Sequence, residues 1–421
     1  MKINKHCFPN GLRLVHYEDT STQMVALNIV YDVGARDEHP EHTGFAHLFE
    51  HLMFGGSAHI PDYDTPLQLA GGENNAWTNN DITNYYLTVP KPNVETAFWL
   101  ESDRMLELAF SEQSLEVQRG VVMEEFKQRC LNQPYGDVGH LFRPLAFRAH
   151  PYRWPTIGKE LSHIEQATLD EVKSFFYRFY APNNAVLAVT GNISWDETVK
   201  LTEKWFAPIP RRDVPVRQLP QEPEQTQERR LTVERNVPLD ALFMGYHMCS
   251  REGADYYAFD ILSDILSNGR SSRLNRRLVQ EQNIFSGIDA YISGTRDAGL
   301  LQISGKPAAG VSLEQAEAAV RKELEELQRS PVDGQELEKV KNKFESTQIF
   351  GNINYLNVAT NLAWFELTGK AEDIDLEVER YRSVTTEQLH TVAQRTFCES
   401  NAVVLYLSLI HISEPTRLRC I

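Results

Sequence analysis

The chain repeats itself over a long distance, and this repeat limits the folds that it can adopt. Thr168-Leu-Asp-Glu-Val and the later Asn184-Ala-Val-Leu return 217 residues further on as Thr385-Thr-Glu-Gln-Leu and Asn401-Ala-Val-Val. A period this long is typical of two copies of one supersecondary unit. Since 421 residues also exceed the size of one ordinary core, we expect two domains of the α+β class.

The local patterns predict strands and helices in both copies. Short runs rich in Val, Ile, Leu and Tyr predict strands at 12–17, 24–33, 75–78, 84–89, 184–189, 229–235, 240–248, 286–293, 299–305 and 402–408. Apolar residues at helical spacing predict helices. The main predicted helices are a segment ending at Gly55-Gly56 and residues 63–70, 94–110, 114–130, 169–180 and 255–266.

A proline-rich stretch separates the two copies. Residues 208–228 hold five prolines among charged residues and glutamines, a composition typical of an exposed and fairly stiff linker. We therefore expect an N-terminal domain at 1–207, a linker at 208–228 and a C-terminal domain at 229–407 that repeats the first.

Charge and cysteine usage exclude several classes of function. A net charge of −16 argues against nucleic-acid binding, which needs clustered basic residues. The acidic balance fits either the attraction of cationic peptides or simple solubility. Five scattered cysteines without a CxxC pair predict neither a disulfide framework nor a thiolate metal site. Without a signal-peptide core or an apolar run of about 18 residues, we expect a cytoplasmic protein that does not enter a membrane.

One short apolar segment carries the residues with the clearest chemical meaning. Residues 44–56 contain His47, Glu50 and His51 in the order His-x-x-Glu-His, the order found in inverzincins. At about 100° per residue, positions i, i+3 and i+4 lie on one face of a helix. Two imidazoles placed in this way can bind a tetrahedral zinc ion, and a carboxylate beside them can accept a proton from water.

A later predicted helix offers a third metal ligand. We expect Val121 and Val122 on its inward stripe, and Glu125 continues that stripe one turn later. A carboxylate in such a position is costly unless it is paired or bound to a metal. Glu124 lies about 100° around the helix and would reach solvent more easily. We therefore expect Glu125, rather than Glu124, to complete the set.

The second copy of the repeat lacks these side chains. Alignment of the copies places three other residues opposite the motif: Asp260, Ser263 and Asp264. A helix with two partly buried, hydrogen-bonded histidines is the alternative interpretation of the motif alone. The apolar setting, Glu125 and the contrast with the second copy favour one zinc ion per chain, bound by His47, His51 and Glu125. The predicted chemistry is peptide hydrolysis, with Glu50 as the general base.

The stretch Asn75, Ala76, Trp77 and Thr78 has a second possible role. A strand at the edge of a sheet can bind an extended peptide through main-chain hydrogen bonds. An ordinary strand of a hairpin is the alternative, and the sequence does not decide between the two.

Several motifs, in order along nearly the whole chain, resemble one family of enzymes. They are Asn10-Gly-Leu-Arg, Gly44–Gly56, Gly72–Tyr86, Arg119-Gly-Val-Val-Met-Glu-Glu, His150-Pro-Tyr-Arg-Trp-Pro and Asn183-Asn-Ala-Val-Leu-Ala-Val-Thr-Gly. Together they resemble the pitrilysin/insulinase family of zinc metallopeptidases. The resemblance is to its short members of about 400 residues, such as the β-subunit of the mitochondrial processing peptidase and bacterial relatives.

This resemblance implies a fold, a ligand set and an assembly. Each half would be a six-stranded, mostly antiparallel sheet flanked by helices. The family's glutamate ligand falls on Glu125, and residues 75–78 would be the substrate-binding edge. Two chains, as a homodimer or as a heterodimer with a related subunit, would enclose a chamber for short or unfolded peptides. A presequence- or leader-processing peptidase and a non-catalytic partner subunit remain alternative functions.

The chain departs from the family pattern at three places. Family members often carry a glutamate seven residues before the glutamate ligand, where this chain has Gln118. The family's substrate-gripping arginine and tyrosine have only Arg296 and Tyr291 as candidates. Residues 408–421 do not match the family, and we expect them to be a non-native tail.

Overall fold

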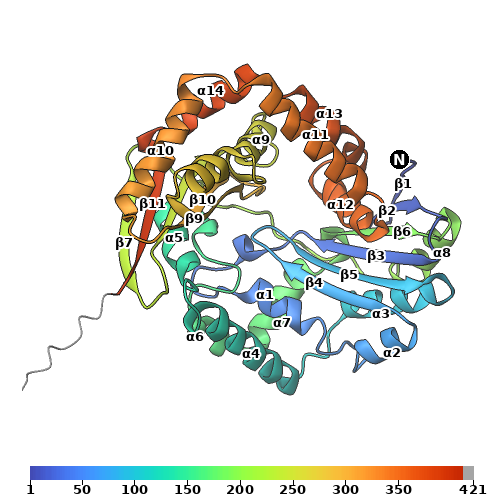
Figure 1. Cartoon of the computed structure of the whole chain (residues 1–421). Coiled ribbons are helices and arrows are strands. Elements are labelled where there is room, and N and C mark those ends of the chain that lie inside the picture. Colours follow the sequence, from blue (N-terminus) through green and yellow to red (C-terminus); the bar gives the residue numbers. More distant parts are fainter. Residues whose placement is uncertain (411–421) are drawn as a thin grey trace, which may run out of the picture. The chain divides into compact units, whose positions relative to one another are not determined.

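The chain folds into two compact units, each built from segments that are distant in sequence. The structure is a computed structural model, and it describes residues 1–410. The first unit contains Met1–Gln128, Phe147–Glu222 and Lys341–Ser383. The second unit contains Arg129–Ala146, Pro223–Val340 and the chain from Val384 onward (Figure 1).

The first unit is organised around a six-stranded sheet with the order β1-β2-β6-β3-β5-β4. Its strands are β1 (Asn4–Cys7), β2 (Arg13–Glu18), β3 (Met24–Tyr31), β4 (Glu73–Thr78), β5 (Thr83–Pro90) and β6 (Ala185–Gly191). All neighbours pair antiparallel except β2 and β6, which are parallel. Strand β4 therefore forms one edge of the sheet.

The second unit contains a five-stranded sheet with the order β7-β11-β8-β10-β9. Its strands are β7 (Arg229–Arg235), β8 (Ala241–Met248), β9 (Phe285–Ile292), β10 (Gly299–Pro307) and β11 (Ala402–Leu409). Strands β7 and β11 are parallel, as β2 and β6 are in the first sheet, and the other pairs are antiparallel. The two sheets thus follow one topology, which confirms the duplicated α+β fold.

The expectation of six strands is wrong for the second sheet. A counterpart of β1 would precede β7, where the described chain forms no strand. This region belongs to the proline-rich segment, and proline cannot donate a hydrogen bond to a neighbouring strand. In the first unit, β1 forms a hairpin with β2 and contributes mostly exposed side chains.

Helices cover both faces of the first sheet. They are α1 (Phe45–Leu52), α2 (Asp64–Leu69), α3 (Val94–Leu106), α4 (Glu112–Phe126), α6 (Leu161–Glu165), α7 (Leu169–Phe179), α8 (Trp195–Trp205), α12 (Tyr355–Thr368) and α13 (Glu377–Ser383). Because side chains alternate along a strand, β3 sends Leu27 and Ile29 into a core shared with α1, α3 and α7. Its Ala26 and Val30 point into a second core, which α12 closes.

The helices of the second unit are fewer. They are α5 (Val138–Ala146), α9 (Tyr256–Ser267), α10 (Leu313–Arg329) and α14 (Thr386–Thr396), while α11 (Gly334–Gly351) connects the units. Helix α5 comes from the first half of the sequence and packs on β7, β8 and β11. Helix α12 comes from the second half and packs on β3 and β6 of the first unit (Figure 1).

The compact units therefore differ from the continuous stretches 1–207 and 229–407 that the sequence suggests. Each half of the sequence contributes a segment to the unit formed by the other half. The physical reason lies in the central strands, whose side chains are buried on both faces and need cover on both. An amphipathic helix reveals that it covers a sheet, but its sequence does not reveal which one.

Most predicted elements are present with shifted ends. The predicted strands overlap β2–β11, while β1 was missed. The α-helical part of the helix predicted at 114–130 ends at Phe126, and a π-helical turn follows at Lys127–Leu131. Ser408 and Leu409, assigned to the expected tail, pair with β7, whereas residues 411–421 lie outside the described residues.

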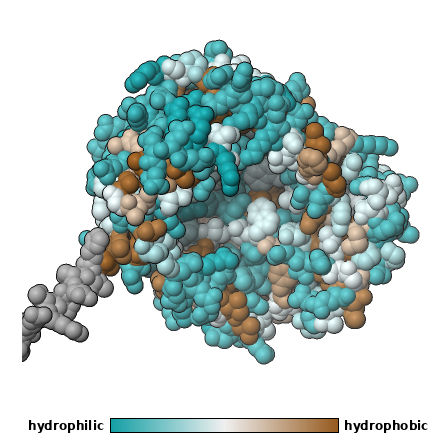
Figure 2. All heavy atoms as spheres, viewed as in Figure 1, coloured by the Kyte–Doolittle hydropathy of each residue, from teal (hydrophilic) through white to brown (hydrophobic). Residues whose placement is uncertain are grey.

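The visible surface is mainly hydrophilic. Figure 2 shows polar residues over most of this face, with apolar residues in small scattered groups. Among the residues that the structure describes, no helix is both long and apolar enough to cross a bilayer.

Candidate metal centre

Helix α1 presents the His-x-x-Glu-His motif at the boundary between core and solvent. Phe45, Leu48, Phe49 and Leu52 are buried and fix the helix against the sheet. Phe49 stacks on the rings of Phe175 and Tyr180, with centroids 5.0 and 5.1 Å away. The opposite side of α1 carries His47, Glu50 and His51, so the apolar spacing of this segment determines where the motif points.

The two histidine side chains lie next to one another, as the helical spacing predicts. Their ring centroids are 4.9 Å apart, and the ring planes are nearly perpendicular. The side chain of His47 is 10% exposed and that of His51 is 24% exposed. Both rings are therefore held by packing, and His51 is the more accessible of the two.

Helix α4 brings Glu125 to these histidines. The Glu125 Oε2 atom lies 3.5 Å from His47 Nε2 and 3.4 Å from His51 Nε2. Glu124 is exposed, and its side chain accepts a hydrogen bond from Gln128. The structure thus places Glu125, and not Glu124, beside the histidine pair.

The stripe argument that selected Glu125 was partly wrong. Leu115, Val122 and Phe126 form the buried face of α4, whereas Val121 is 46% exposed. Glu125 lies at the edge of the buried face, between the core and solvent. Glu125 therefore has the partial exposure expected of a ligand in an accessible site, and it does not continue an inward-facing stripe.

The spacing of the three side chains fits a zinc ion. With bonds of about 2.0–2.1 Å and tetrahedral angles, two ligand atoms of zinc lie about 3.4 Å apart. The two distances that involve Glu125 match this value, and all three donor atoms lie within 4.8 Å of one another. Two imidazole nitrogens and one carboxylate oxygen also form a donor set typical of a catalytic zinc site with an open fourth position.

Glu50 is tied to the edge strand of the sheet. The Thr78 hydroxyl donates a hydrogen bond of 2.6 Å to Glu50 Oε2. Thr78 is the last residue of β4, so the predicted general base and the predicted substrate-binding strand are in direct contact. Along β4, Asn75 is exposed, while Ala76, Trp77 and Thr78 are partly exposed.

A buried ion pair supports the loop that follows α1. The Arg104 guanidinium donates to both oxygens of Glu101, and both side chains are 1% exposed. Arg104 also lies over the rings of Phe54, Tyr63 and Tyr85, with centroids 4.4–5.0 Å away. Sequence reasoning missed this pair, although a glutamate and an arginine three residues apart in an apolar helix were its available signal.

The corresponding helix of the second unit has no such arrangement. On α9, the Ser263 hydroxyl donates to the Asp260 carbonyl, and Asn268 donates to Asp264. Within residues 1–410, only His47, His51 and Glu125 form a group of three or more His, Cys, Asp or Glu side chains that could hold a metal ion.

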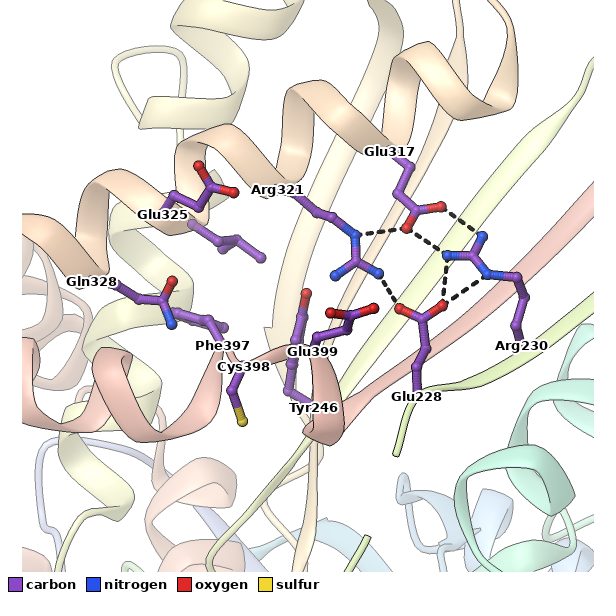
Figure 3. A pocket seen from close by; sticks show the side chains of 11 residues that line it. Glu228, Arg230, Tyr246, Glu317, Arg321, Glu325, Gln328, Phe397, Cys398 and Glu399 are labelled. Carbon is purple, nitrogen blue, oxygen red and sulfur yellow. Dashed lines mark hydrogen bonds and ion pairs between the residues drawn. The ribbon is translucent and has the colours of Figure 1, made fainter. Parts of the chain in front are cut away.

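The second unit contains a cavity of about 430 Å³ whose described lining residues do not form a group that could hold a metal ion. Figure 3 shows it beside α10 and β8, where Glu228 and Glu317 form ion pairs with Arg230 and Arg321. These pairs neutralise one another and hold β7 against α10. The charged groups at this end of the cavity are thus explained by packing between elements.

The two candidate substrate-binding residues of the second half lie near the end of β9 and in the loop that follows it. Tyr291 lies on β9 and is 48% exposed. Burial raises the pKa of its hydroxyl, and the nearby Arg143 opposes that rise. Arg296 follows in the loop to β10. A role for Arg296 and Tyr291 in substrate binding stays a prediction.

Comparison with known families identifies both halves of the chain. Residues 13–143 match the family described as Insulinase (Peptidase family M16). Residues 166–344 match the domain described as Peptidase M16 inactive domain. The candidate metal ligands His47, His51 and Glu125 thus fall in the first matched region, and helix α9 falls in the second.

Curated relatives of similar length carry zinc protease names. The zinc protease PqqE of Helicobacter pylori is 26% identical over 404 residues, which cover 94% of this chain and 91% of the relative. The uncharacterized zinc protease YmxG of Bacillus subtilis is 25% identical over 406 residues, which cover 96% of this chain and 98% of the relative.

Solved structures share the fold over almost the whole chain. A protease from Helicobacter pylori matches with a TM-score of 0.92 and 26% identity, covering 97% of this chain and 99% of that one. A peptidase M16 inactive domain from Pseudomonas fluorescens has a TM-score of 0.89 at 16% identity, with 99% and 100% coverage. At this identity the second similarity shows the fold alone.

Proposed function

The chain belongs to peptidase family M16, the insulinase family, and we propose that it is a zinc-dependent endopeptidase that hydrolyses short or unfolded peptides. The observation that carries this proposal is the approach of Glu125 to His47 and His51 at zinc-ligand spacing. The names of the relatives support the same metal and the same class of reaction.

The proposed roles follow from position and chemistry. His47, His51 and Glu125 hold one zinc ion per chain. Zinc in this position supplies Lewis acidity, which polarises a peptide carbonyl and makes water a stronger acid. Glu50 lies beside the ligands without being one of them, and it accepts a proton from water and later delivers it to the leaving amine. The Thr78 hydroxyl orients the Glu50 carboxylate for this transfer.

The substrate is proposed to bind along β4 as an additional strand. Strand β4 is an edge of its sheet, so its outer backbone groups can pair with an extended peptide. Residues Asn75, Ala76, Trp77 and Thr78 would contact that peptide. The link from Thr78 to Glu50 would then place a peptide bond next to the general base. An extended chain segment without its own fold can add to an edge in this way.

Two alternatives remain within this framework. A dedicated presequence- or leader-processing peptidase would use the same site with a narrower substrate range. A non-catalytic partner subunit is less compatible with a complete set of ligands and base in the first unit. We also propose that the chain works as a dimer, with another copy or with a related subunit.

The proposed activity can be tested on the purified chain. Quenched fluorescent peptides with varied basic residues should be cleaved, chelation should abolish cleavage, and added zinc should restore it. Cleavage that is unaffected by a chelator would contradict the zinc mechanism. A broad range of cleaved peptides supports the general endopeptidase, whereas cleavage restricted to one basic sequence supports the processing alternative.

A further inference from the structure

The helix with the metal ligands begins without a cap of its own. The first backbone N–H groups of a helix lack partners within it, and a side chain at the N-cap position usually accepts from one of them. In α1 this position is Gly44, which has no side chain and adopts a left-handed conformation with φ 88°. A helix of eight residues has few hydrogen bonds, so the state of its first turn matters.

Glu38, six residues earlier, takes the place of the missing cap. Its Oε2 accepts the Gly44 N–H and its Oε1 accepts the Ala46 N–H, each at 2.9 Å. The side chain is nearly completely buried. A carboxylate at this position also interacts favourably with the positive end of the helix dipole. Since His47 directly follows Ala46, Glu38 holds the turn from which the first metal ligand projects.

Glu38 ends a short 3-10 turn that spans residues 34–38, and this turn is fixed on several sides. The Trp154 indole donates to the Ala35 carbonyl at 3.0 Å. The backbone N–H groups of Ala35 and Arg36 donate to the carbonyls of Asn79 and Asn80, which directly follow β4. The same turn therefore contacts the start of the metal-binding helix and the end of the proposed substrate strand.

Arg217 of the proline-rich segment closes this arrangement. Its Nε donates to Asp37 Oδ1 at 2.5 Å, and its Nη1 donates to Asp32 Oδ2 at 2.8 Å. Asp37 in turn accepts the Gly34 N–H at 3.0 Å, at the start of the turn. Further along, the Glu222 carboxylate accepts the N–H groups of residues 148–150 at 2.8–3.0 Å. The segment between the copies is thus anchored on the first unit at two points.

We propose that Glu38 and Arg217 are positioning residues for the metal centre. Arg217 fixes the turn, the turn places Glu38, and Glu38 holds the first turn of α1 so that His47 meets His51 and Glu125 at zinc spacing. This inference rests on the proposed function, because it assumes that zinc binds to these three residues.

The burial of Glu38 makes glutamine an informative replacement. Burial raises the pKa of the Glu38 carboxyl to about 8, although its bonds to the Ala46 and Gly44 N–H groups oppose that rise. Glu38→Gln keeps the shape of the side chain and places no charge in this buried position at any pH, so we expect the variant to fold. Its single amide oxygen replaces two oxygens, and its NH2 group, which only donates, faces one of the two backbone N–H groups, so the first turn loses an acceptor.

The test compares zinc binding and catalysis in the full-length chain. Variants Glu38→Gln, Arg217→Ala and Arg217→Lys are compared with Arg211→Ala, which removes an exposed arginine of the same segment. Zinc Kd is measured by competition with a chromophoric chelator, and kcat and KM are measured with one quenched peptide. All measurements are made at a temperature well below the Tm of each variant. If the cap contributes about 1 kcal/mol to the ligand geometry, zinc Kd rises about fivefold in Glu38→Gln and Arg217→Ala.

The expected pattern distinguishes positioning from general stability. We expect a lower kcat, a KM within about twofold of wild type, partial recovery in Arg217→Lys, and no change in Arg211→Ala. A lower Tm with unchanged zinc Kd and kcat in Glu38→Gln and Arg217→Ala would overturn the inference. If Glu38→Gln does not fold, equal zinc Kd in the two Arg217 variants and wild type would overturn it. A wild-type chain that binds no zinc would instead contradict the proposed function.

Discussion

Glu50 illustrates at the residue scale how position separates two roles for one type of side chain. Glu125 reaches both histidines, while Glu50 lies on the same helix as the histidines and accepts the Thr78 hydroxyl. A carboxylate outside the ligand set keeps a free electron pair for the transfer of a proton. We therefore propose metal binding for Glu125 and proton transfer for Glu50.

The first prediction separates these roles. Glu50→Gln should retain zinc, because the three ligands are unchanged, and should lose at least about 10²-fold in kcat, the usual contribution of a general base. Thr78→Val, which only removes the orienting hydroxyl, should lose less, about tenfold. Steady-state kinetics and elemental analysis of the same samples measure both quantities. Near-normal cleavage by Glu50→Gln would show that another group accepts the proton.

Local helical spacing accounts for three of the four residues predicted for this candidate site, whereas the stripe argument for the fourth, Glu125, was partly wrong. His47, Glu50 and His51 share a face by helical spacing, and the structure brings Glu125 to the two histidines. Glu38 could not be predicted, because its role depends on a turn held by Trp154 and by Arg217, which is 179 residues away in sequence. The same limit applies to contacts of Thr78 with Glu50, which need the packing of α1 beside β4.

At the scale of elements, exchanged helices are the main departure from expectation. Helix α12 covers β3 and β6 although it begins at Tyr355, 164 positions after Gly191, the end of β6. Its Val358, Leu362 and Ala363 are fully buried against that sheet. The periodicity of these residues predicts a helix with an apolar face, but choosing the covered sheet requires three-dimensional information. Strand β1 escaped prediction because it pairs through its backbone and exposes polar side chains.

The second prediction tests the contribution of α12 to the first unit. Leu362→Ala leaves a cavity against the sheet and should lower the free energy of unfolding by about 2–5 kcal/mol. Leu69→Ala is the matched control, since Leu69 is 84% exposed and its replacement should change stability by less than about 0.5 kcal/mol. Urea denaturation followed by tryptophan fluorescence measures both. Equal effects of the two replacements would contradict the role assigned to α12.

At the scale of the whole molecule, two copies of one topology differ in whether they carry candidate metal ligands. In the first copy, the edge strand β4 contacts helix α1, which carries the two histidines of the candidate zinc site. In the second copy, the corresponding residues of helix α9 form hydrogen bonds within the helix and with Asn268. The repeat in the sequence predicted two related domains. The repeat alone did not predict that the described second sheet has five strands, because the two copies differ before β7, where the second has a proline-rich segment.

The third prediction concerns stability of the chain at low pH. Burial disfavours the charge of Glu317, but hydrogen bonds from Arg230, Tyr406 and Arg321 outweigh it and lower the pKa of Glu317 to about 2. Because the pKa is below its unfolded value, the stabilisation is present above about pH 4.5 and is lost as pH falls toward 2. The Tm advantage of wild type over Glu317→Gln should therefore shrink across this range. A constant Tm difference from pH 7 to pH 3 would contradict this assignment.

The central claim is that Glu125 completes one zinc site with His47 and His51. The most direct measurement is the zinc content per chain of wild type, Glu125→Gln and Glu124→Gln, purified in parallel and analysed by elemental mass spectrometry. The adjacent Glu124 is a matched control, because it is exposed and has the same chemistry. We predict about one zinc ion per chain in wild type and Glu124→Gln, and a strong loss in Glu125→Gln. A wild-type chain without zinc, or equal zinc content in both variants, would contradict the claim.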